Sequence, residues 1–262
     1  MIPFYKYHGA GNDFVIIDDR ESRFDTSDVE LISKMCNRHF GIGADGLMLL
    51  REINGYDFEM VYFNSDGRPS SMCGNGGRCL VSFAAKLGVV SSECKFMAVD
   101  GEHKAVVHSQ DDISLEMIDV DQIENIGKSD LLLNTGSPHY IVVSDDVDSI
   151  DLVTEARKIR YSDRFKEVGV NVNFIQRTSD GIQIRTYERG VEAETLACGT
   201  GVTAAAIASH ELGWFESPVT VNAVGGKLNV SFDVKGHTFF NVWKRGPVEL
   251  VFEGQYFVEG GK

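Results

Sequence analysis

Two cysteines each stand directly before a glycine-containing turn, in segments that lie far apart in the chain. The first is in "MCGNGGRC" at 72–79 and the second is in "ACGTG" at 197–201. Both turns lead into segments of helical character, which predicts that Cys73 and Cys198 lie at helix N-termini. Amide groups at such a terminus have no partner inside the helix, and the positive end of the helix dipole is close. Both effects stabilise a thiolate, so either cysteine could serve as a base near neutral pH.

The glycines beside the two cysteines indicate a second property of these turns. A backbone without side chains lets a ligand approach closely, and exposed amides at a helix start suit a carboxylate or a phosphate. Neither turn has the glycine and lysine spacing of a phosphate-binding loop, which makes a carboxylate the better candidate. The positions concerned are Gly74, Gly76, Gly77, Gly199 and Gly201.

A pair of thiols has a specific chemical use if each comes from one half of a duplicated fold. Halves that pack about a pseudo-twofold axis would make Cys73 and Cys198 face each other across a cleft. One thiolate could then remove a proton from a substrate carbon while the other thiol protonates the opposite face, which inverts the configuration. The helix-start amides would hold the negative charge that develops. This chemistry requires neither a metal nor a redox cofactor.

A cysteine before a glycine is also an ordinary packing arrangement, because free cysteine is among the most buried residue types. The presence of two such sites at equivalent positions favours function over packing. The other three cysteines are predicted to be packing residues, since Cys36 lies on an apolar helix face, Cys79 inside a helix and Cys94 at the start of a strand. Five cysteines without a CxxC pair indicate neither a disulfide framework nor a zinc site.

An internal repeat relates the two halves of the chain. A shift of 125 residues aligns a strand end, a Cys-Gly-x-Gly turn and a helix that ends in Leu-Gly, without a gap. The repeat predicts two related domains, residues 1–118 and 119–251. The aligned pairs are Tyr62 with Tyr187, Cys73 with Cys198, Gly74 with Gly199, Gly76 with Gly201, Leu87 with Leu212 and Gly88 with Gly213.

Strand patterns dominate the chain, interrupted by four predicted helices. The helices are expected at about 28–38, 76–87, 150–160 and 200–212, the first opened by a capping box of Ser27 and Glu30. Tight hairpin turns are predicted at Asp180-Gly181 and Gly225-Gly226. Short β-branched or aromatic runs predict strands at 13–18, 56–63, 95–100, 104–109, 113–119, 139–145, 181–188, 227–234 and 248–254.

Length and charge limit the classes of function. The 262 residues suffice for one large domain or two of ordinary size, and the net charge of −14 gives no basic footprint for nucleic acid or an anionic membrane. No run of about 20 apolar residues is present, and the first residues lack the regions of a signal peptide. We therefore expect a cytoplasmic protein with a small-molecule substrate.

The motifs around the two thiols resemble those of diaminopimelate epimerases, the cofactor-independent enzymes of lysine synthesis. The resemblance covers essentially the whole chain. The CGNG and CGTG turns alone would also suit proline racemases, whereas "GAGNDF" and "YERG" favour the epimerases. The matching motifs are "HGAGNDFVIID" at 8–18, "GIGADG" at 41–46, "FNSDG" before Cys73, "TGSPH" at 135–139, "GVNVNF" at 169–174 and "YERG" before "LACGTG".

The resemblance implies a role for each matching residue near the reacting carbon. Cys73 and Cys198 match the two acid/base thiols of the family, and Glu188 matches the acid that contacts the amine there. His139 matches a histidine that influences the pKa of the thiols. The positions whose amides hold the carboxylate are Gly74, Asn75, Gly199 and Thr200.

The resemblance also implies how the distal, non-reacting end of the substrate is bound. An arginine suits this task because a guanidinium can hold a carboxylate through two hydrogen bonds. The matching residues are Asn12, Asn64, Asn171 and Arg189. Two departures concern this end: Ser137 stands where many members have asparagine, and Gly46 stands where some have glutamine.

Taken together, the resemblance implies an α+β fold of two pseudo-symmetric domains, each a mostly antiparallel sheet wrapped around a central helix. The C-terminal segment 252–262 is expected to pack on the first domain. The implied activity is the interconversion of LL- and meso-2,6-diaminopimelate by a homodimer with reduced cysteines, without a cofactor or metal. The alternatives are a racemase of another amino acid such as proline, a thiol redox protein and a non-catalytic amino acid binding protein.

Overall fold

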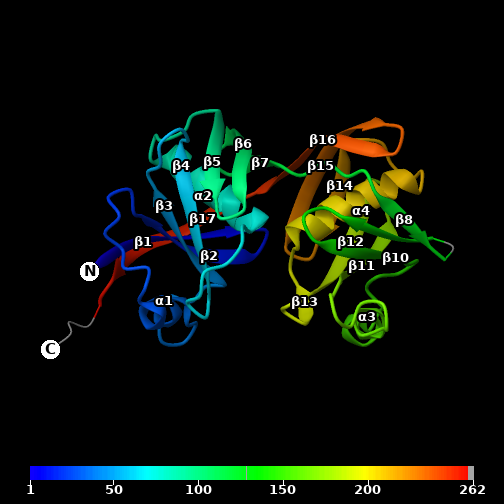
Figure 1. Cartoon of the computed structure of the whole chain (residues 1–262), viewed down its shortest axis with the longest axis horizontal. Coiled ribbons are helices and arrows are strands. Elements are labelled where there is room, and N and C mark those ends of the chain that lie inside the picture. Colours follow the sequence, from blue (N-terminus) through cyan, green and yellow to red (C-terminus); the bar gives the residue numbers. More distant parts are fainter. Residues whose placement is uncertain (128, 259–262) are drawn as a thin grey trace. The chain divides into compact units, whose positions relative to one another are not determined.

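The computed structural model describes residues 1–127 and 129–258 (Figure 1). The chain divides into two compact units, one formed by residues 1–115 with the C-terminal segment from Pro247 and the other by Glu116–Gly246. Within the described residues each unit contains a set of hydrogen-bonded strands and two helices. The predicted α+β class is confirmed, and most neighbouring strands are antiparallel.

The sheet of the first unit has the strand order β17-β1-β2-β3-β4-β5-β6-β7, in which only β2–β3 and β4–β5 are parallel pairs. The C-terminal strand β17 pairs antiparallel with β1 at the edge of this sheet. The strands are β1 (Ile2–Gly9), β2 (Asn12–Asp18), β3 (Gly46–Arg51), β4 (Phe58–Asn64), β5 (Glu93–Ala98), β6 (Gly101–Ser109), β7 (Asp112–Glu116) and β17 (Glu249–Tyr256).

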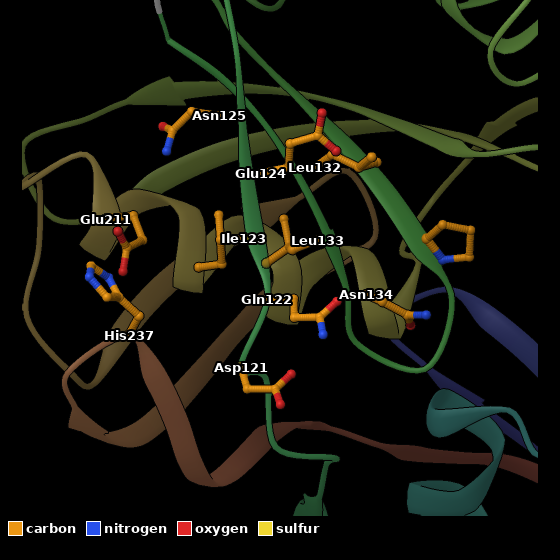
Figure 2. Close-up of a pocket in the computed structure, with 11 residues that line it drawn as sticks. Asp121, Gln122, Ile123, Glu124, Asn125, Leu132, Leu133, Asn134, Glu211 and His237 are labelled. Carbon is orange, nitrogen blue, oxygen red and sulfur yellow. The ribbon is translucent and has the colours of Figure 1, made fainter.

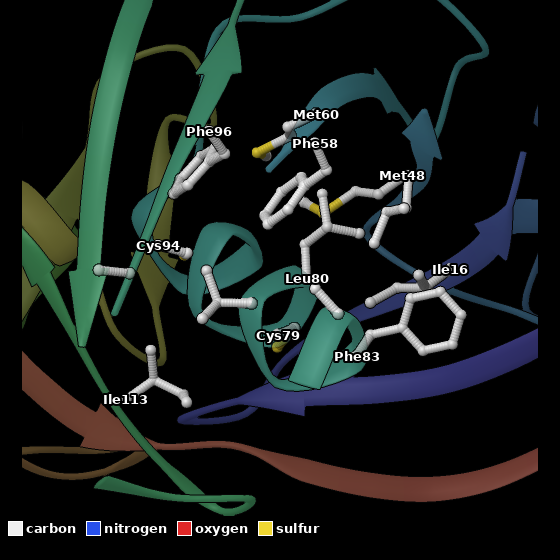
Figure 3. Close-up of a cluster of buried hydrophobic side chains, with 14 of the residues drawn as sticks. Ile16, Met48, Phe58, Met60, Cys79, Leu80, Phe83, Cys94, Phe96 and Ile113 are labelled. Atoms are coloured by element: carbon white, nitrogen blue, oxygen red, sulfur yellow. The ribbon is translucent and has the colours of Figure 1, made fainter. Parts of the chain in front are cut away.

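Helix α2 (Gly74–Lys86) forms the centre of the first unit. It packs against β1, β2, β3 and β6, and its residues are buried from Asn75 to Ala84. Figure 3 shows Cys79, Leu80 and Phe83 of this helix among the apolar side chains that the strands supply. Apolar surface on every side of α2 is removed from water, so the hydrophobic effect holds the sheet around the helix.

Helix α1 (Val29–Cys36) covers the outer face of the same sheet, where Ile32, Met35 and Cys36 are buried. The predicted start of this helix was wrong by one residue. The N-cap is Asp28, whose carboxylate accepts a hydrogen bond from the amide of Leu31. Aspartate is as good a cap as serine, and here it stands one residue closer to the apolar positions.

The sheet of the second unit has the order β8-β9-β10-β11-β12-β14-β15-β16, with β10–β11 and β12–β14 parallel. The short strand β13 (Ala193–Thr195) pairs with β12. The other strands are β8 (Ile123–Ile126), β9 (Asp130–Asn134), β10 (Pro138–Val143), β11 (Asn171–Arg177), β12 (Ile182–Glu188), β14 (Val219–Ala223), β15 (Gly226–Lys235) and β16 (Thr238–Pro247).

Helix α4 (Gly199–Glu211) lies at the centre of the second unit, and α3 (Leu152–Arg160) packs on the outer face of its sheet. The two central helices each have 13 residues, and each is followed by a leucine cap and a glycine of positive φ, Gly88 or Gly213. The bounds of α2 and α4 differ by the shift of 125 residues. The registers agree too, since Phe14 pairs with Gly46 and His139 with Asn171.

A hairpin does join β11 to β12, but its turn was predicted one residue too late: Arg177 pairs with Ile182 and the amide of Thr178 donates to the carbonyl of Gly181, so Ser179 and Asp180 are at the tip. The second predicted turn was wrong. Ala223 pairs with Gly226, so the two residues of the turn are Val224 and Gly225, and Gly226 already belongs to the strand.

Candidate active site

The first thiol lies at the N-cap of α2, with extended backbone angles at Cys73. Its S–H donates to Oδ1 of Asn12 across 3.5 Å, and Nδ2 of Asn75 contacts the same oxygen at 3.5 Å. The amide of Asn12 is oriented by Asp45, whose carboxylate accepts from its Nδ2 at 2.5 Å. The first unit therefore brings together three of the predicted site residues, Asn12, Cys73 and Asn75.

A tight turn sets the position of Asn12. Ala10 and Gly11 both have positive φ, and Gly9 pairs with Asn12, which is the geometry of a two-residue hairpin. The "GAGND" motif therefore places Asn12 at the first position of β2.

Asn64 ends β4 and is exposed, and it pairs with Gly46 of the neighbouring strand β3. A Cβ atom at position 46 would lie 2.5 Å from the carbonyl oxygen of Phe63 and 2.5 Å from Cε2 of Tyr62. The Tyr62 ring thus takes the space that a larger residue at position 46 would need. Packing against Tyr62 therefore explains why this chain has glycine at position 46, where some family members have glutamine.

The second thiol lies at the N-cap of α4, where Cys198 is buried. Its Sγ lies 3.5 Å from Oγ1 of Thr200. Burial raises the pKa of Cys198 to about 11, and the charge of Glu188 acts in the same direction, against hydrogen bonds from Thr200 and the Gly201 amide. The expected lowering of the thiol pKa is therefore not found at Cys198, because loss of hydration outweighs the helix terminus.

His139 lies next to this thiol and is completely buried on β10. Its Nε2 is 2.9 Å from Oγ1 of Thr200 and 3.0 Å from Oγ of Ser137, and its Nδ1 is 3.0 Å from Nδ2 of Asn173. Burial lowers the pKa of His139 to about 3. The imidazole is therefore neutral at physiological pH. Ser137 lies next to the same threonine, with its Oγ 3.2 Å from Oγ1 of Thr200.

The burial of His139 predicts acid sensitivity of the fold. Its pKa falls from 6.5 to about 3 on folding, so the unfolded chain binds more protons between these values. The free energy of unfolding should therefore decrease as the pH drops through this window, by at most about 1.4 kcal/mol per pH unit. Denaturant titrations from pH 4 to 8 measure the slope. His139→Phe should reduce the slope of the unfolding free energy against pH by the equivalent of one bound proton. An unchanged slope would contradict the lowered pKa of His139.

Asn171 and Arg189 form a second group of predicted residues in this unit. Oδ1 of Asn171 accepts from the backbone amide of Arg189 at 2.9 Å, and its Nδ2 donates to Oγ of Ser137 at 3.0 Å. The exposed guanidinium of Arg189 donates to the carbonyl of Val168 at 3.0 Å. Glu188 precedes it at the end of β12 and accepts from the Thr195 hydroxyl at 2.9 Å.

The remaining cysteines have the properties of packing residues, as predicted. Cys36, Cys79 and Cys94 are buried, and burial raises the pKa of each thiol, to about 12 for Cys36 and Cys94. None of these three cysteines lies at a helix N-terminus, which distinguishes them from Cys73 and Cys198.

Arg78 is a candidate that the sequence did not single out. Its side chain is fully buried in the first unit, and Nη1 lies 3.5 Å from the carbonyl oxygen of Gly74 at the start of α2. Within residues 1–127 and 129–258 its Nε and Nη2 have no hydrogen-bond partner. The positive charge interacts with the thiols of Cys79 and Cys73. The only sequence signal was an arginine in the first turns of a helix that opens with three glycines.

A cavity of about 590 Å³ in the second unit contains none of the thirteen predicted site residues (Figure 2). It is bordered by residues from β8 and β9, by Glu211 at the end of α4 and by His237.

Among the described residues no group of three His, Cys, Asp or Glu could hold a metal ion. Within residues 1–127 and 129–258 no helix is long and apolar enough to cross a membrane.

Solved structures with the same fold include a PhzF-family phenazine biosynthesis protein from Bacillus anthracis and a probable proline racemase from Agrobacterium radiobacter. The first superposes with a TM-score of 0.73 at 13% identity, covering 98% of this chain and 99% of the other. The second superposes with a TM-score of 0.67 at 15% identity, covering 99% and 94%. The fold class is therefore the one shared by PhzF proteins and proline racemases.

The family within this class follows from sequence similarity. A family model for diaminopimelate epimerase matches residues 4–123 and 131–251. A diaminopimelate epimerase of Flavobacterium psychrophilum is 51% identical over 251 residues, 95% of this chain and 98% of the relative. One from Aquifex aeolicus is 39% identical over 277 residues, 96% of both chains. The chain belongs to the diaminopimelate epimerase family.

Membership confirms the predicted resemblance and the predicted class of enzyme, an isomerase that acts on diaminopimelate. The thiol redox protein and the non-catalytic binding protein receive no support. Proline racemases share only the fold with this chain, at 15% identity.

Proposed function

We propose that the chain interconverts LL- and meso-2,6-diaminopimelate by a two-base mechanism in which Cys73 and Cys198 act on opposite faces of one α-carbon. One observation carries this proposal: each unit places a cysteine at the N-cap of a 13-residue helix, at the same point of the same strand order. Cysteine is not among the residues preferred at a helix N-cap, so helix capping does not explain a cysteine at both caps.

The proposed step is a proton exchange at carbon. One thiolate takes the α-proton, and the electron pair of the broken C–H bond spreads into the adjacent carboxylate. The other thiol then gives its proton to the opposite face, and the charge ends on its sulfur. Reversal exchanges the two roles, so neither thiol is consumed.

The helix starts are proposed to hold the carboxylate at the reacting carbon. The first amides of α2 and α4 have no acceptor within their helices and lie at the positive end of the dipole. Donors in fixed positions stabilise charge that develops in the transition state. The amides assigned to this task belong to Gly74, Asn75, Gly199 and Thr200, and Glu188 is assigned to the substrate ammonium.

The distal amino acid end is proposed to bind Asn12, Asn64, Asn171 and Arg189. Arg189 is exposed and held by Asn171 through its backbone, which leaves its guanidinium on the surface of the unit. The short hydroxyl of Ser137 is engaged with Asn171 and Thr200. Ser137 is therefore assigned to the Cys198 surroundings.

Arg189→Lys should raise KM about 10- to 100-fold while kcat changes by less than about threefold. Lysine keeps the charge but cannot offer two parallel hydrogen bonds to the distal carboxylate, so binding is weakened away from the reacting carbon. Steady-state kinetics with both diaminopimelate isomers measure the two constants. A fall in kcat without a change in KM would place Arg189 at the reaction itself.

The proposed reaction is tested by deuterium incorporation. Purified protein is incubated in deuterated water with LL-diaminopimelate, meso-diaminopimelate or proline, and α-proton exchange and configuration are followed by NMR and chiral chromatography. Exchange with inversion for diaminopimelate alone is the expected result. Exchange in proline alone would reject the substrate, and inversion without solvent deuterium would reject the two-thiol mechanism.

We further propose that the enzyme works as a homodimer in the cytoplasm, in the biosynthesis of lysine and cell-wall precursors. A reducing compartment would keep both thiols free for proton transfer. Exposed apolar side chains of the edge strand β17, Val251 and Phe252, support self-association. Light scattering coupled to size exclusion measures the mass, and a monomer at micromolar concentration would refute the dimer.

A further inference from the structure

A continuous series of hydrogen bonds runs through the second unit and ends at the second thiol. Thr186 Oγ1 donates to Oδ1 of Asn173 at 3.0 Å, and Nδ2 of Asn173 lies 3.0 Å from Nδ1 of His139. His139 Nε2 lies 2.9 Å from Thr200 Oγ1, which lies 3.5 Å from Cys198 Sγ. Thr186, Asn173 and His139 are buried, so water does not compete for these groups.

Backbone groups fix the direction of this series at Asn173. Its Nδ2 lies 3.3 Å from the carbonyl oxygen of Tyr140, which can only accept, while its Oδ1 receives the Thr186 hydroxyl. The amide nitrogen therefore faces His139 and donates to Nδ1. A neutral imidazole that accepts at Nδ1 carries its single proton on Nε2.

The direction is also fixed at Ser137. Asn171 Nδ2 donates to the carbonyl oxygen of Pro138 at 3.1 Å and to Ser137 Oγ at 3.0 Å, while Asn171 Oδ1 accepts the Arg189 amide. Ser137 Oγ therefore accepts from Asn171. Its own proton is free to point to Thr200 Oγ1, 3.2 Å away.

Both neighbours of Thr200 Oγ1 thus supply protons. The Nε2–H of His139 lies between Thr200 Oγ1 at 2.9 Å and Ser137 Oγ at 3.0 Å, and together with the Ser137 hydroxyl it occupies the lone pairs of Thr200 Oγ1. The remaining direction leads to Cys198 Sγ, so the Thr200 hydroxyl donates to the sulfur. A donor at this place favours a thiolate over a thiol.

We propose that Asn173 and Thr186 are positioning residues that hold His139 as its Nε2–H tautomer and thereby aim the Thr200 hydroxyl at Cys198 Sγ. The inference rests on the proposed acid/base role of Cys198. When this thiol protonates the substrate carbon, its S–H bond breaks, a C–H bond forms and a negative charge remains on a buried sulfur. The Thr200 hydroxyl stabilises that charge without reorientation.

The repeat shows that this arrangement belongs to one unit only. The positions equivalent to His139, Asn173 and Thr186 hold Phe14, Met48 and Val61, which are apolar. At the first thiol the S–H of Cys73 instead donates to an amide oxygen. The two sulfurs therefore have hydrogen-bond neighbours of opposite character, an acceptor in the first unit and a donor in the second.

The test combines the tautomer of His139 with kinetics of the full-length protein. In ¹⁵N-histidine NMR spectra, assigned with a His139→Asn variant, we expect a bare Nδ1 and a protonated Nε2 throughout pH 6–8. Asn173→Asp should move the proton to Nδ1, because a carboxylate accepts where the amide donated. Thr200 would then donate to Nε2, and kcat should fall about 10- to 100-fold with KM nearly unchanged, as for loss of one hydrogen bond to a charged group.

Thr186→Val provides a second variant that introduces no buried charge. It frees Oδ1 of Asn173, so the amide can turn over, and we expect a mixture of tautomers with a smaller fall in kcat, about 3- to 10-fold. If Asn173→Asp does not fold, Thr186→Val alone tests whether the His139 tautomer affects kcat. A wild-type protein with Nδ1–H, a shifted tautomer with unchanged kcat, or a reduced kcat with an unshifted tautomer would each overturn the inference.

A matched pair of residues in the same unit controls for general effects. Thr220 Oγ1 donates to Oδ1 of Asn229 at 3.0 Å between β14 and β15, away from His139. Asn229→Asp and Thr220→Val should leave kcat and the His139 tautomer unchanged. Cys198→Ala separates the two proposals: retained activity there would refute the proposed function, whereas the tautomer measurement would still report on Asn173.

Discussion

Cys73→Ala and Cys198→Ala should each lower kcat/KM for epimerisation by about four orders of magnitude. Inversion by two bases needs a proton acceptor on one face and a donor on the other, and each variant leaves one face without either. Circular dichroism should show intact folds, because each substitution removes one sulfur atom at a helix cap and leaves the backbone of the cap unchanged. Coupled assays of both isomers, with single-turnover deuterium exchange, measure the loss.

Cys79→Ala is the matched control for these two variants. Its sulfur is fully buried in the core of the first unit, so the variant should lose about 1 kcal/mol of stability and keep kcat within about twofold. A similar loss of activity in all three variants would assign the effect to packing and refute the role of the two thiols.

The central helices could be predicted from the sequence because their ends carry local signals. A glycine of positive φ ends both α2 and α4, and it follows the last leucine as the patterns required. The internal repeat was the second signal for these helices, because a shift of 125 residues aligns the bounds of α2 with those of α4.

The strand patterns missed β3, a strand that is buried on both faces. Strand β3 (GLMLLR) lies between α1 on one side of its sheet and α2 on the other, and its first five residues are buried. Such a strand has no alternation of polar and apolar residues, so its pattern does not differ from that of a helix. The sequence also missed β1, β8, β9, β11, β13, β14 and β16.

Motifs selected Asn12, His139 and Asn171 from the sequence, and the structure places Asn12 next to Cys73, His139 next to Thr200 and Asn171 next to Ser137. Asn173 and Thr186 were missed because a buried polar side chain on a strand leaves no periodic signal of its own. The alternation in "NVNF" contained a hint, since Asn171 and Asn173 lie on one face of β11 and both are buried.

The pKa of Cys198 shows why a local motif does not determine a thiol's acidity. A helix N-terminus lowers the pKa of an accessible thiol, whereas burial of the same sulfur removes its hydration and raises it to about 11. Sequence reveals the helix terminus but not the depth of burial. The Thr200 hydroxyl partly offsets that burial, so its orientation matters at Cys198.

Gly201→Ala should lower kcat about 100-fold, whereas Gly76→Ala at the equivalent position of the first unit should lower it less than about tenfold. A Cβ at position 201 would lie 2.6 Å from Oδ1 of Asn173 and 3.3 Å from Cε1 of His139. Asn173 cannot retreat without breaking hydrogen bonds to Thr186 and Tyr140. The added methyl group must therefore displace the groups that orient Thr200, and small displacements near reacting atoms cost about this much rate.

At position 76 the new Cβ would lie 1.8 Å from Cε of Met48, which is the end of a flexible side chain that can rotate away. Both variants should lose about 1 to 3 kcal/mol of stability from overpacking, so thermal unfolding alone will not separate them. The ratio of their kcat values distinguishes the two variants. Equal losses would mean that the two glycines serve the approach of the substrate to both helix starts alike, and that the polar series behind Cys198 has no part in catalysis.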